Sequence, residues 1–190
     1  MLKVCLSALA LVVLHAVPTT AAPADEKSIV VIETSMGNIE VELDAAKAPV
    51  SVANFLKYVD SGFYDGLIFH RIIPGFMIQG GGFDPKLKEK SEGVRGPIKN
   101  ESGNGLSNVR GTIAMARTAR PDSATCQFYI NVDDNSDKLD APRYAVFGKV
   151  LSGMEVADNI VKARRGSQGG MDDVPLTPIL IKSVKRKAKA

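Results

Sequence analysis

Short runs rich in β-branched and aromatic residues recur along most of the chain, and they limit the possible folds more than any other feature of the sequence. The runs typical of β-strands are Ile29–Thr34, Ile39–Leu43, Leu67–Ile73, Thr112–Ala116, Gln127–Val132, Tyr144–Val150 and Pro178–Val184. Apolar residues recur at helical spacing in two segments, Pro49–Val59 and Met154–Val161. Many short strands and two helices favour a closed antiparallel sheet whose ends are covered by the helices.

The segments between these runs predict turns and one long irregular stretch. Ser35–Asn38 is typical of a hairpin turn between the first two strands. Residues 80–110 are rich in glycine and polar residues, and so long a stretch without regular structure is usually functional or disordered. The sequence contains no repeat, coiled coil or internal linker, and 190 residues fit one domain.

The first 24 residues predict a secretory signal peptide. Lys3 is followed by a mostly apolar run, Val4–Val17, and then by small residues that end in Ala22-Pro23-Ala24. The run is shorter than the roughly 20 residues that span a bilayer, so an uncleaved membrane anchor is the weaker alternative. We expect cleavage before Asp25, with cleavage after Ala22 as the alternative.

The mature protein is then expected to be one exported domain, residues 25–190. Its core covers about residues 28–184, and a basic, solvated tail follows at 185–190. The net charge of +3 is too small to indicate a nucleic-acid partner or an anionic membrane surface. No long apolar seam is present, so we expect a monomer.

Cleavage would leave one histidine, His70, and one cysteine, Cys126. These residues can form neither an internal disulfide nor a zinc site of the usual Cys/His type, so we predict no metal and no cofactor. A nucleophilic Cys126–His70 pair is possible, but a lone cysteine in an apolar strand is more often a small core residue. The acidic pairs Asp133-Asp134 and Asp172-Asp173 lie in polar sequence and are expected to be solvated.

The segment from Phe69 to Gly81 is the best candidate for a functional site. Strand alternation predicts that Phe69 and Arg71 face one way and that His70 faces the other. An arginine among apolar residues is costly to bury unless it is hydrogen-bonded or borders a pocket. Two interpretations follow: a cleft with a few oriented polar groups, or an edge-strand arginine paired to a carboxylate above ordinary core. The residue chemistry by itself favours the second.

This segment, with the sequence FHRIIPGFMIQGG, closely resembles the signature of the cyclophilins, which are peptidyl-prolyl cis-trans isomerases. Four further blocks resemble the same family, namely 49–55, 110–117, 127–131 and 145–150. The resemblance extends over about Ser28–Val184, and together with the signal peptide it is typical of the periplasmic bacterial branch. It implies an eight-stranded antiparallel barrel capped by two α-helices, and proline-containing polypeptides as substrates.

The resemblance also implies site residues. Arg71 matches the catalytic arginine, and His70 matches a histidine with a supporting role. The expected substrate-binding residues are Phe76, Met77, Gln79, Ala116, Gln127, Tyr129, Leu139 and Tyr144.

Two positions differ from the eukaryotic members. Tyr144 stands in the place of a pocket histidine, and Lys138 stands in the place of a tryptophan that binds cyclosporin. These differences concern drug sensitivity more than catalysis.

Two other functions remain as alternatives: a binding module or chaperone for proline-containing peptides with little turnover, and a barrel that binds nucleic acid through its basic tail. The intact arginine of the motif favours the enzyme, and the small net charge disfavours the nucleic-acid reading.

Overall fold

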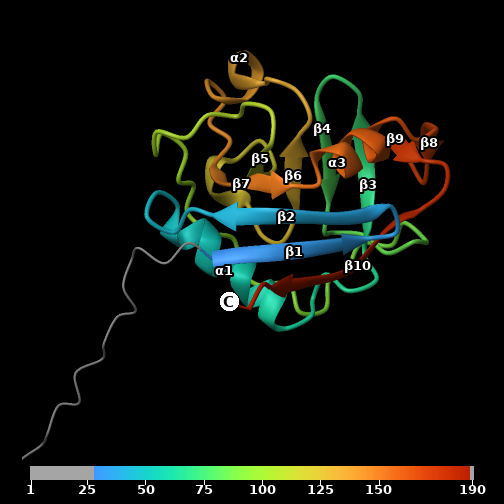
Figure 1. The fold of residues 1–190 in the computed structure, drawn as a ribbon, viewed down its shortest axis with the longest axis horizontal. Coiled ribbons are helices and arrows are strands. Elements are labelled where there is room, and N and C mark those ends of the chain that lie inside the picture. The colour runs from blue at the N-terminus through green and yellow to red at the C-terminus, as the bar shows by residue number, and fades with distance from the viewer. Residues whose placement is uncertain (1–27, 189–190) are drawn as a thin grey trace, which may run out of the picture.

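The computed structural model describes residues 28–188, and the predicted signal peptide therefore lies outside the described residues. Eight strands form a closed barrel in the order β1-β10-β3-β4-β6-β5-β7-β2 (Figure 1). All pairs in the barrel are antiparallel. The predicted fold class is thus confirmed.

The barrel strands have the following bounds: β1 Ser28–Thr34, β2 Gly37–Leu43, β3 Ile68–Ile73, β4 Met77–Gly80, β5 Thr112–Met115, β6 Phe128–Asn131, β7 Val146–Ser152 and β10 Ile179–Arg186. Strand β4 follows the Pro74-Gly75 turn and is the one barrel strand that periodicity did not predict. Ser35 and Met36 form the turn between β1 and β2, as expected.

Two helices pack against the barrel near opposite ends of β1 and β2 (Figure 1). Helix α1 covers Pro49–Asp60 and helix α3 covers Met154–Val161. Both place their apolar faces in the same core cluster as the inward-facing strand residues. No helix within residues 28–188 has the length and apolar character needed to cross a bilayer.

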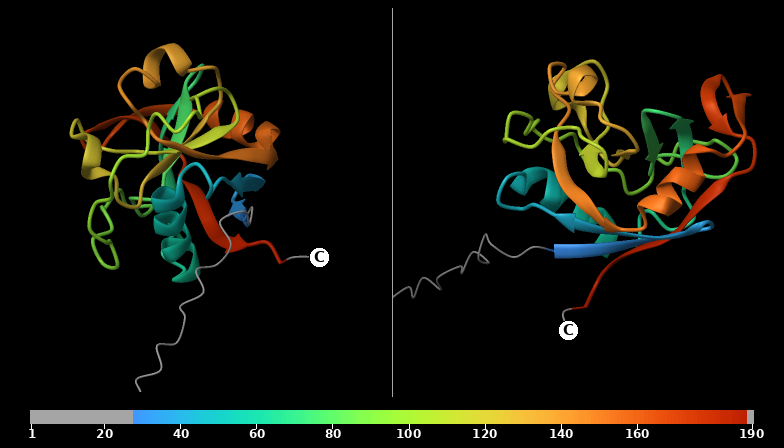
Figure 2. Two further views of the ribbon diagram at one scale, coloured as in Figure 1. Left: turned by 90° about the vertical axis from the view of Figure 1, so that its left-hand side faces the viewer. Right: turned by 45° about the horizontal axis from the view of Figure 1, so that its top comes forward.

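Four smaller elements were not predicted. A single helical turn, α2, covers Ser136–Leu139, and a 3-10 turn covers Pro121–Ser123. Strands β8, Arg165–Gln168, and β9, Met171–Pro175, form a separate hairpin that projects from the barrel (Figure 2).

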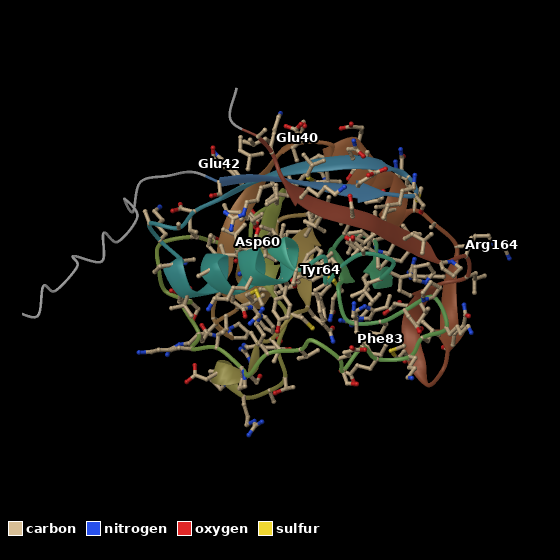
Figure 3. All side chains as sticks on the ribbon, turned by 90° about the horizontal axis from the view of Figure 1, so that it is seen from below. Glu40, Glu42, Asp60, Tyr64, Phe83 and Arg164 are labelled. Carbon is tan, nitrogen blue, oxygen red and sulfur yellow. The ribbon has the colours of Figure 1, made fainter. Side chains whose placement is uncertain are left out.

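Strand alternation separates a buried inner face from a charged outer face on the β1–β2 side. In β2, Ile39, Val41 and Leu43 are fully buried. Glu40 and Glu42 lie between them on the outer face (Figure 3). Glu40 accepts from Lys187 Nζ at 2.9 Å, and Glu42 lies 3.6 Å from Lys149 Nζ.

The irregular segment 81–111 wraps the barrel and stabilises distant elements. The carboxylate of Glu101 accepts hydrogen bonds from the backbone N–H groups of Val50 and Ser51 at 2.9 and 2.7 Å. These N–H groups belong to the first turn of α1, whose own preceding residue, Ala48, offers no side-chain cap. A carboxylate at this position satisfies free donors and interacts favourably with the helix dipole.

Candidate active site

On the β4–β6–β5–β7 side, both faces of the barrel wall are apolar. Ile113 and Met115 belong to the core inside the barrel, whereas Ala114 and Ala116 belong to a second apolar cluster. Neighbouring strands add Met77, Tyr129 and Val146 to this second cluster. Since side chains alternate along a strand, the second cluster lies on the outer surface of the sheet.

A cavity of about 120 Å³ opens at this outer cluster. Its walls are formed by Arg71, Phe76, Met77, Gln79, Ala116, Arg117, Tyr129, Leu139 and Tyr144. Eight of these residues were predicted as site residues. The short helix α2 supplies Leu139 and the segment after it supplies Tyr144, so the structure brings both residues to the cavity.

Arg71 is exposed at this cavity on β3. The predicted alternation was wrong for Phe69, which is fully buried in the barrel core, as is Ile72. A bulge between Phe69 and Arg71 causes the change, because the pairing with β4 shifts register at His70. The bulge turns Phe69 inward while Arg71 stays on the outer face.

The edge-strand interpretation of Arg71 was also wrong. Strand β3 has neighbours on both sides, β10 and β4. Within residues 28–188, Arg71 forms no salt bridge with a carboxylate. Its guanidinium therefore has donors available for a ligand in the cavity.

Gln127 does not line the cavity but contacts a residue that does. Gln79 Nε2 donates to Gln127 Oε1 at 2.9 Å. Gly82 makes this arrangement possible, because a Cβ there would lie 2.5 Å from Nε2 and 2.6 Å from Cδ of Gln127. Gly82, the residue directly after the FHRIIPGFMIQGG segment, thus leaves room for the side chain of Gln127.

We predict that Gly82→Ala lowers the kcat/KM of a reaction at this cavity by roughly tenfold, since it displaces Gln127 from Gln79 and one hydrogen bond of this kind contributes about 1 kcal/mol or more. The melting temperature should change little, because the clash is with the flexible end of a side chain. Gly96→Ala is the matched control, since nothing lies within 4 Å of a Cβ there. In a Gln127→Ala background, Gly82→Ala should have no further effect; a full additional loss there would contradict this explanation.

A buried asparagine joins two of the residues in the cavity wall, Tyr129 and Tyr144, to Asp140. Asn108 Oδ1 accepts from Tyr129 Oη at 2.7 Å. Its Nδ2 donates to Asp140 Oδ1 at 2.8 Å and to the Tyr144 carbonyl at 3.2 Å. Asn135 continues the network by donating to the Phe76 carbonyl at 2.7 Å. These bonds fix the pocket walls, and no local pattern in the sequence indicated them.

Arg117 lines the cavity but was not among the predicted site residues. Its guanidinium carbon lies 4.3 Å from the centre of the Tyr144 ring. The sequence did contain a signal for including Arg117 in the site: the residue belongs to the 110–117 block and directly follows Ala116.

His70 lies behind the site rather than in the cavity. Only 5% of its surface is exposed, and its ring centre lies 4.6 Å from that of Phe83. Its Nδ1 is buried without a hydrogen-bond partner. Burial lowers the pKa of His70 from 6.5 to about 4, and the nearby Arg71 charge adds to the effect. His70 is therefore neutral at pH 7.

Cys126 is a buried core residue, and burial raises the pKa of its thiol. No hydrogen bond joins it to His70 among the described residues, so the nucleophilic pair is not formed. Asp133, Asp134 and Asp172 are exposed, as expected of solvated carboxylates, whereas Asp173 is half-buried and forms an ion pair with Arg165. Residues 28–188 contain no group of three or more His, Cys, Asp or Glu side chains placed to hold a metal ion.

Comparison with known proteins agrees with the geometry. The family model described as cyclophilin type peptidyl-prolyl cis-trans isomerase/CLD matches residues 29–186. Peptidyl-prolyl cis-trans isomerase A of Dickeya dadantii is 57% identical over 159 residues, which cover 82% of this chain and 83% of the relative. Peptidyl-prolyl cis-trans isomerase B of Escherichia coli K12 is 48% identical, covering 82% and 98%.

A solved structure supports the same assignment. The crystal structure of a cyclophilin type peptidyl-prolyl cis-trans isomerase from Cryptosporidium parvum matches with a TM-score of 0.74 at 26% identity. The match covers 87% of this chain and all of the other. A second structure of that protein was determined in the presence of the dipeptide Ala-Pro. With its barrel, its outer cavity and these matches, the chain belongs to the cyclophilin-type peptidyl-prolyl cis-trans isomerase family.

Proposed function

We propose that this isomerase acts on Xaa-Pro bonds of exported polypeptides as they fold, with Arg71 as the catalytic residue. The observation that carries the assignment is a guanidinium without a carboxylate partner at the wall of a cavity of about 120 Å³, most of whose other wall residues are apolar or aromatic. The Cryptosporidium parvum relative studied with Ala-Pro supports proline-containing ligands for such a site.

The chemistry follows from the amide bond. Resonance gives the peptide C–N bond partial double-bond character and a rotation barrier of about 18–20 kcal/mol. In the twisted transition state that resonance is lost, and the prolyl nitrogen gains an available lone pair. Arg71 can donate a hydrogen bond to this nitrogen only once the lone pair has formed. The arginine thereby binds the transition state more tightly than the ground state.

The other site residues hold the substrate while the bond rotates. Phe76, Met77, Tyr129 and Leu139 form apolar walls that can hold a proline ring. The Gln79–Gln127 pair leaves Gln79 Oε1 and Gln127 Nε2 without a bonding partner in the described part of the chain. These two atoms can accept from and donate to the backbone of the residue before proline.

Arg71 alone cannot account for a typical enzymatic rate gain. A millionfold acceleration needs roughly 8 kcal/mol, at about 1.36 kcal/mol per tenfold. A hydrogen bond to a charged donor contributes only about 1.5–3 kcal/mol. Binding of the ring and exclusion of water from the cavity must supply the remainder.

A protease-coupled isomerisation assay on an Ala-Ala-Pro-Phe peptide tests the activity directly. We expect first-order acceleration in proportion to enzyme concentration. Peptide binding without acceleration would instead identify a binding module for proline-containing peptides.

The export of the protein is a separate part of the proposal and rests on residues 1–24. We propose that this signal segment is removed and that the mature domain, residues 25–190, works as a monomer in the periplasm without membrane attachment. Mass spectrometry of the periplasmic fraction should find an N-terminus near Asp25. An intact Met1 would contradict the proposal.

We further predict weak inhibition by cyclosporin, and tighter inhibition after Lys138→Trp. Lys138 is exposed on α2, with Nζ 5.7 Å from the centre of the Phe76 ring. A hydrated ammonium cannot reproduce the flat apolar contact of an indole. An aromatic anchor of this kind typically contributes about 2 kcal/mol, or roughly thirtyfold in affinity.

The cyclosporin inhibition constant of Lys138→Trp should therefore be roughly thirtyfold lower than that of the unsubstituted protein, with peptide turnover nearly unchanged. Lys138→Ala serves as the control, because it removes the ammonium without adding an indole. Tight inhibition of the unsubstituted protein would show that Lys138 does not occupy the drug-binding position.

A further inference from the structure

Two arginines line the cavity, and no acidic residue does. Arg71 and Arg117 are the charged members of its wall. Neither forms a salt bridge with a carboxylate among residues 28–188. The catalytic role proposed above uses Arg71 but leaves the charge of Arg117 without a function.

Arg117 is held in place by backbone carbonyl groups from two segments of the chain. Nη1 donates to the carbonyl of Thr118 at 2.8 Å and more weakly to that of Ala119 at 3.4 Å. Nη2 donates to the carbonyls of Pro142 and Arg143. One edge of the guanidinium thus binds the segment after Ala116, and another binds the turn before Tyr144.

Stacking on Tyr144 completes this arrangement. The guanidinium carbon lies 4.3 Å from the ring centre, within the range of a cation–π contact. The hydrogen bonds of its Nη groups and the stacking on one face hold the guanidinium in this position. The positive charge is therefore fixed at the wall of the cavity.

The acidic residues of the neighbouring segments do not line the cavity, and three of them accept hydrogen bonds from neutral groups. Asp140 accepts hydrogen bonds from Ser107 and Asn108. Asp122 accepts from the backbone N–H of Asn100, and Asp134 accepts from Ser136. The exposed Asp133 and Asp137 do not line the cavity.

We infer that Arg117 is a specificity-determining residue that favours peptides with an aspartate or glutamate directly before or after the proline. This inference rests on the proposed function. The attraction is electrostatic and needs no direct hydrogen bond, since the Nη groups of Arg117 already donate to carbonyls. A partly exposed charge pair of this kind is expected to change kcat/KM two- to fivefold.

The test compares matched peptides in the isomerisation assay at low salt. The first pair is Ala-Glu-Pro-Phe and Ala-Gln-Pro-Phe. The second pair is Ala-Ala-Pro-Glu and Ala-Ala-Pro-Gln, and its isomerisation is monitored by a direct conformational readout rather than by protease cleavage. We expect kcat/KM to be two- to fivefold higher for glutamate in at least one pair. The ratio should approach one near 1 M salt, where the Debye length falls to about 3 Å. Ratios of one or below in both pairs at low salt would overturn the inference.

Variants then assign the preference to Arg117. Arg117→Gln should bring the Glu/Gln ratio close to one, whereas Arg117→Lys should retain most of it. Each ratio is measured within one protein, so a general loss of activity or folding cancels. A purely structural role would lower both rates equally, and an unchanged ratio in Arg117→Gln would exclude Arg117 as the cause.

Lys185→Gln is the matched control, because it makes the same change in net charge at an exposed position of β10, away from the cavity walls. It should leave the ratio unchanged.

The two levels of the proposal fail in different ways. If no peptide is isomerised, the proposed function is wrong, whereas isomerisation without a charge preference refutes only the role of Arg117.

Discussion

Arg71→Ala should lower kcat/KM for an Xaa-Pro peptide roughly ten- to hundredfold while the barrel stays folded. The lost interaction is a charge-assisted hydrogen bond, which contributes about 1.5–3 kcal/mol and is made only in the transition state. The side chain is exposed and has no salt-bridge partner among the described residues, so its removal leaves no buried charge behind.

The measurement pairs the isomerisation assay with circular dichroism and a melting curve. Arg71→Lys separates charge from geometry: a lysine keeps the charge but lacks the planar fork, so most of the activity should still be lost. Arg165→Ala, at an exposed ion pair with Asp173 on the β8–β9 hairpin, is the control for removing an arginine elsewhere. A folded Arg71→Ala protein with full activity would refute the catalytic role.

The second large effect is a loss of stability as the pH falls from about 6.5 to 4, and we assign it to His70. In the folded protein the pKa of His70 is about 4, whereas an unfolded histidine has a pKa near 6.5. Between these values only the unfolded state binds the proton, which stabilises that state. The free energy of unfolding should therefore decrease by about 3 kcal/mol across this range, at about 1.36 kcal/mol per pH unit.

Urea unfolding at pH 7, 6, 5 and 4.5, at constant ionic strength, measures this dependence. His70→Gln cannot be protonated, so it should remove most of the slope. Four aspartates also have lowered pKa values because of hydrogen bonds from neighbouring groups: Asp60, Asp134, Asp140 and Asp158. Most of their contribution is lost as the pH falls below 3.8, and any loss that begins within the tested range is the same in both proteins. Equal slopes for the two proteins would show that His70 is not the source.

The local sequence determined most of the strands and both main helices of the barrel, because strand alternation and helical spacing depend only on residues a few positions apart. Ile113, Phe128 and Phe147 face the core, as the strand patterns require, and Pro49 opens the first helix. The family resemblance as a whole pointed to eight of the residues that line the cavity, including Leu139 and Tyr144 in a loop with no periodic pattern. The strand and helix patterns, in contrast, each depend on residues a few positions apart.

Tertiary structure decided the features that join distant segments. The bulge at His70 depends on the register with β4, and it reversed the expected direction of Phe69. The contact of Gly82 with Gln127 and the bond from Tyr129 to Asn108 each connect parts of the chain that no periodic pattern relates. Arg117 acquires its place at the cavity from carbonyl groups about 25 residues away. Backbone pairing and packing between elements set these contacts, so the supports of the site could be found only in the folded chain.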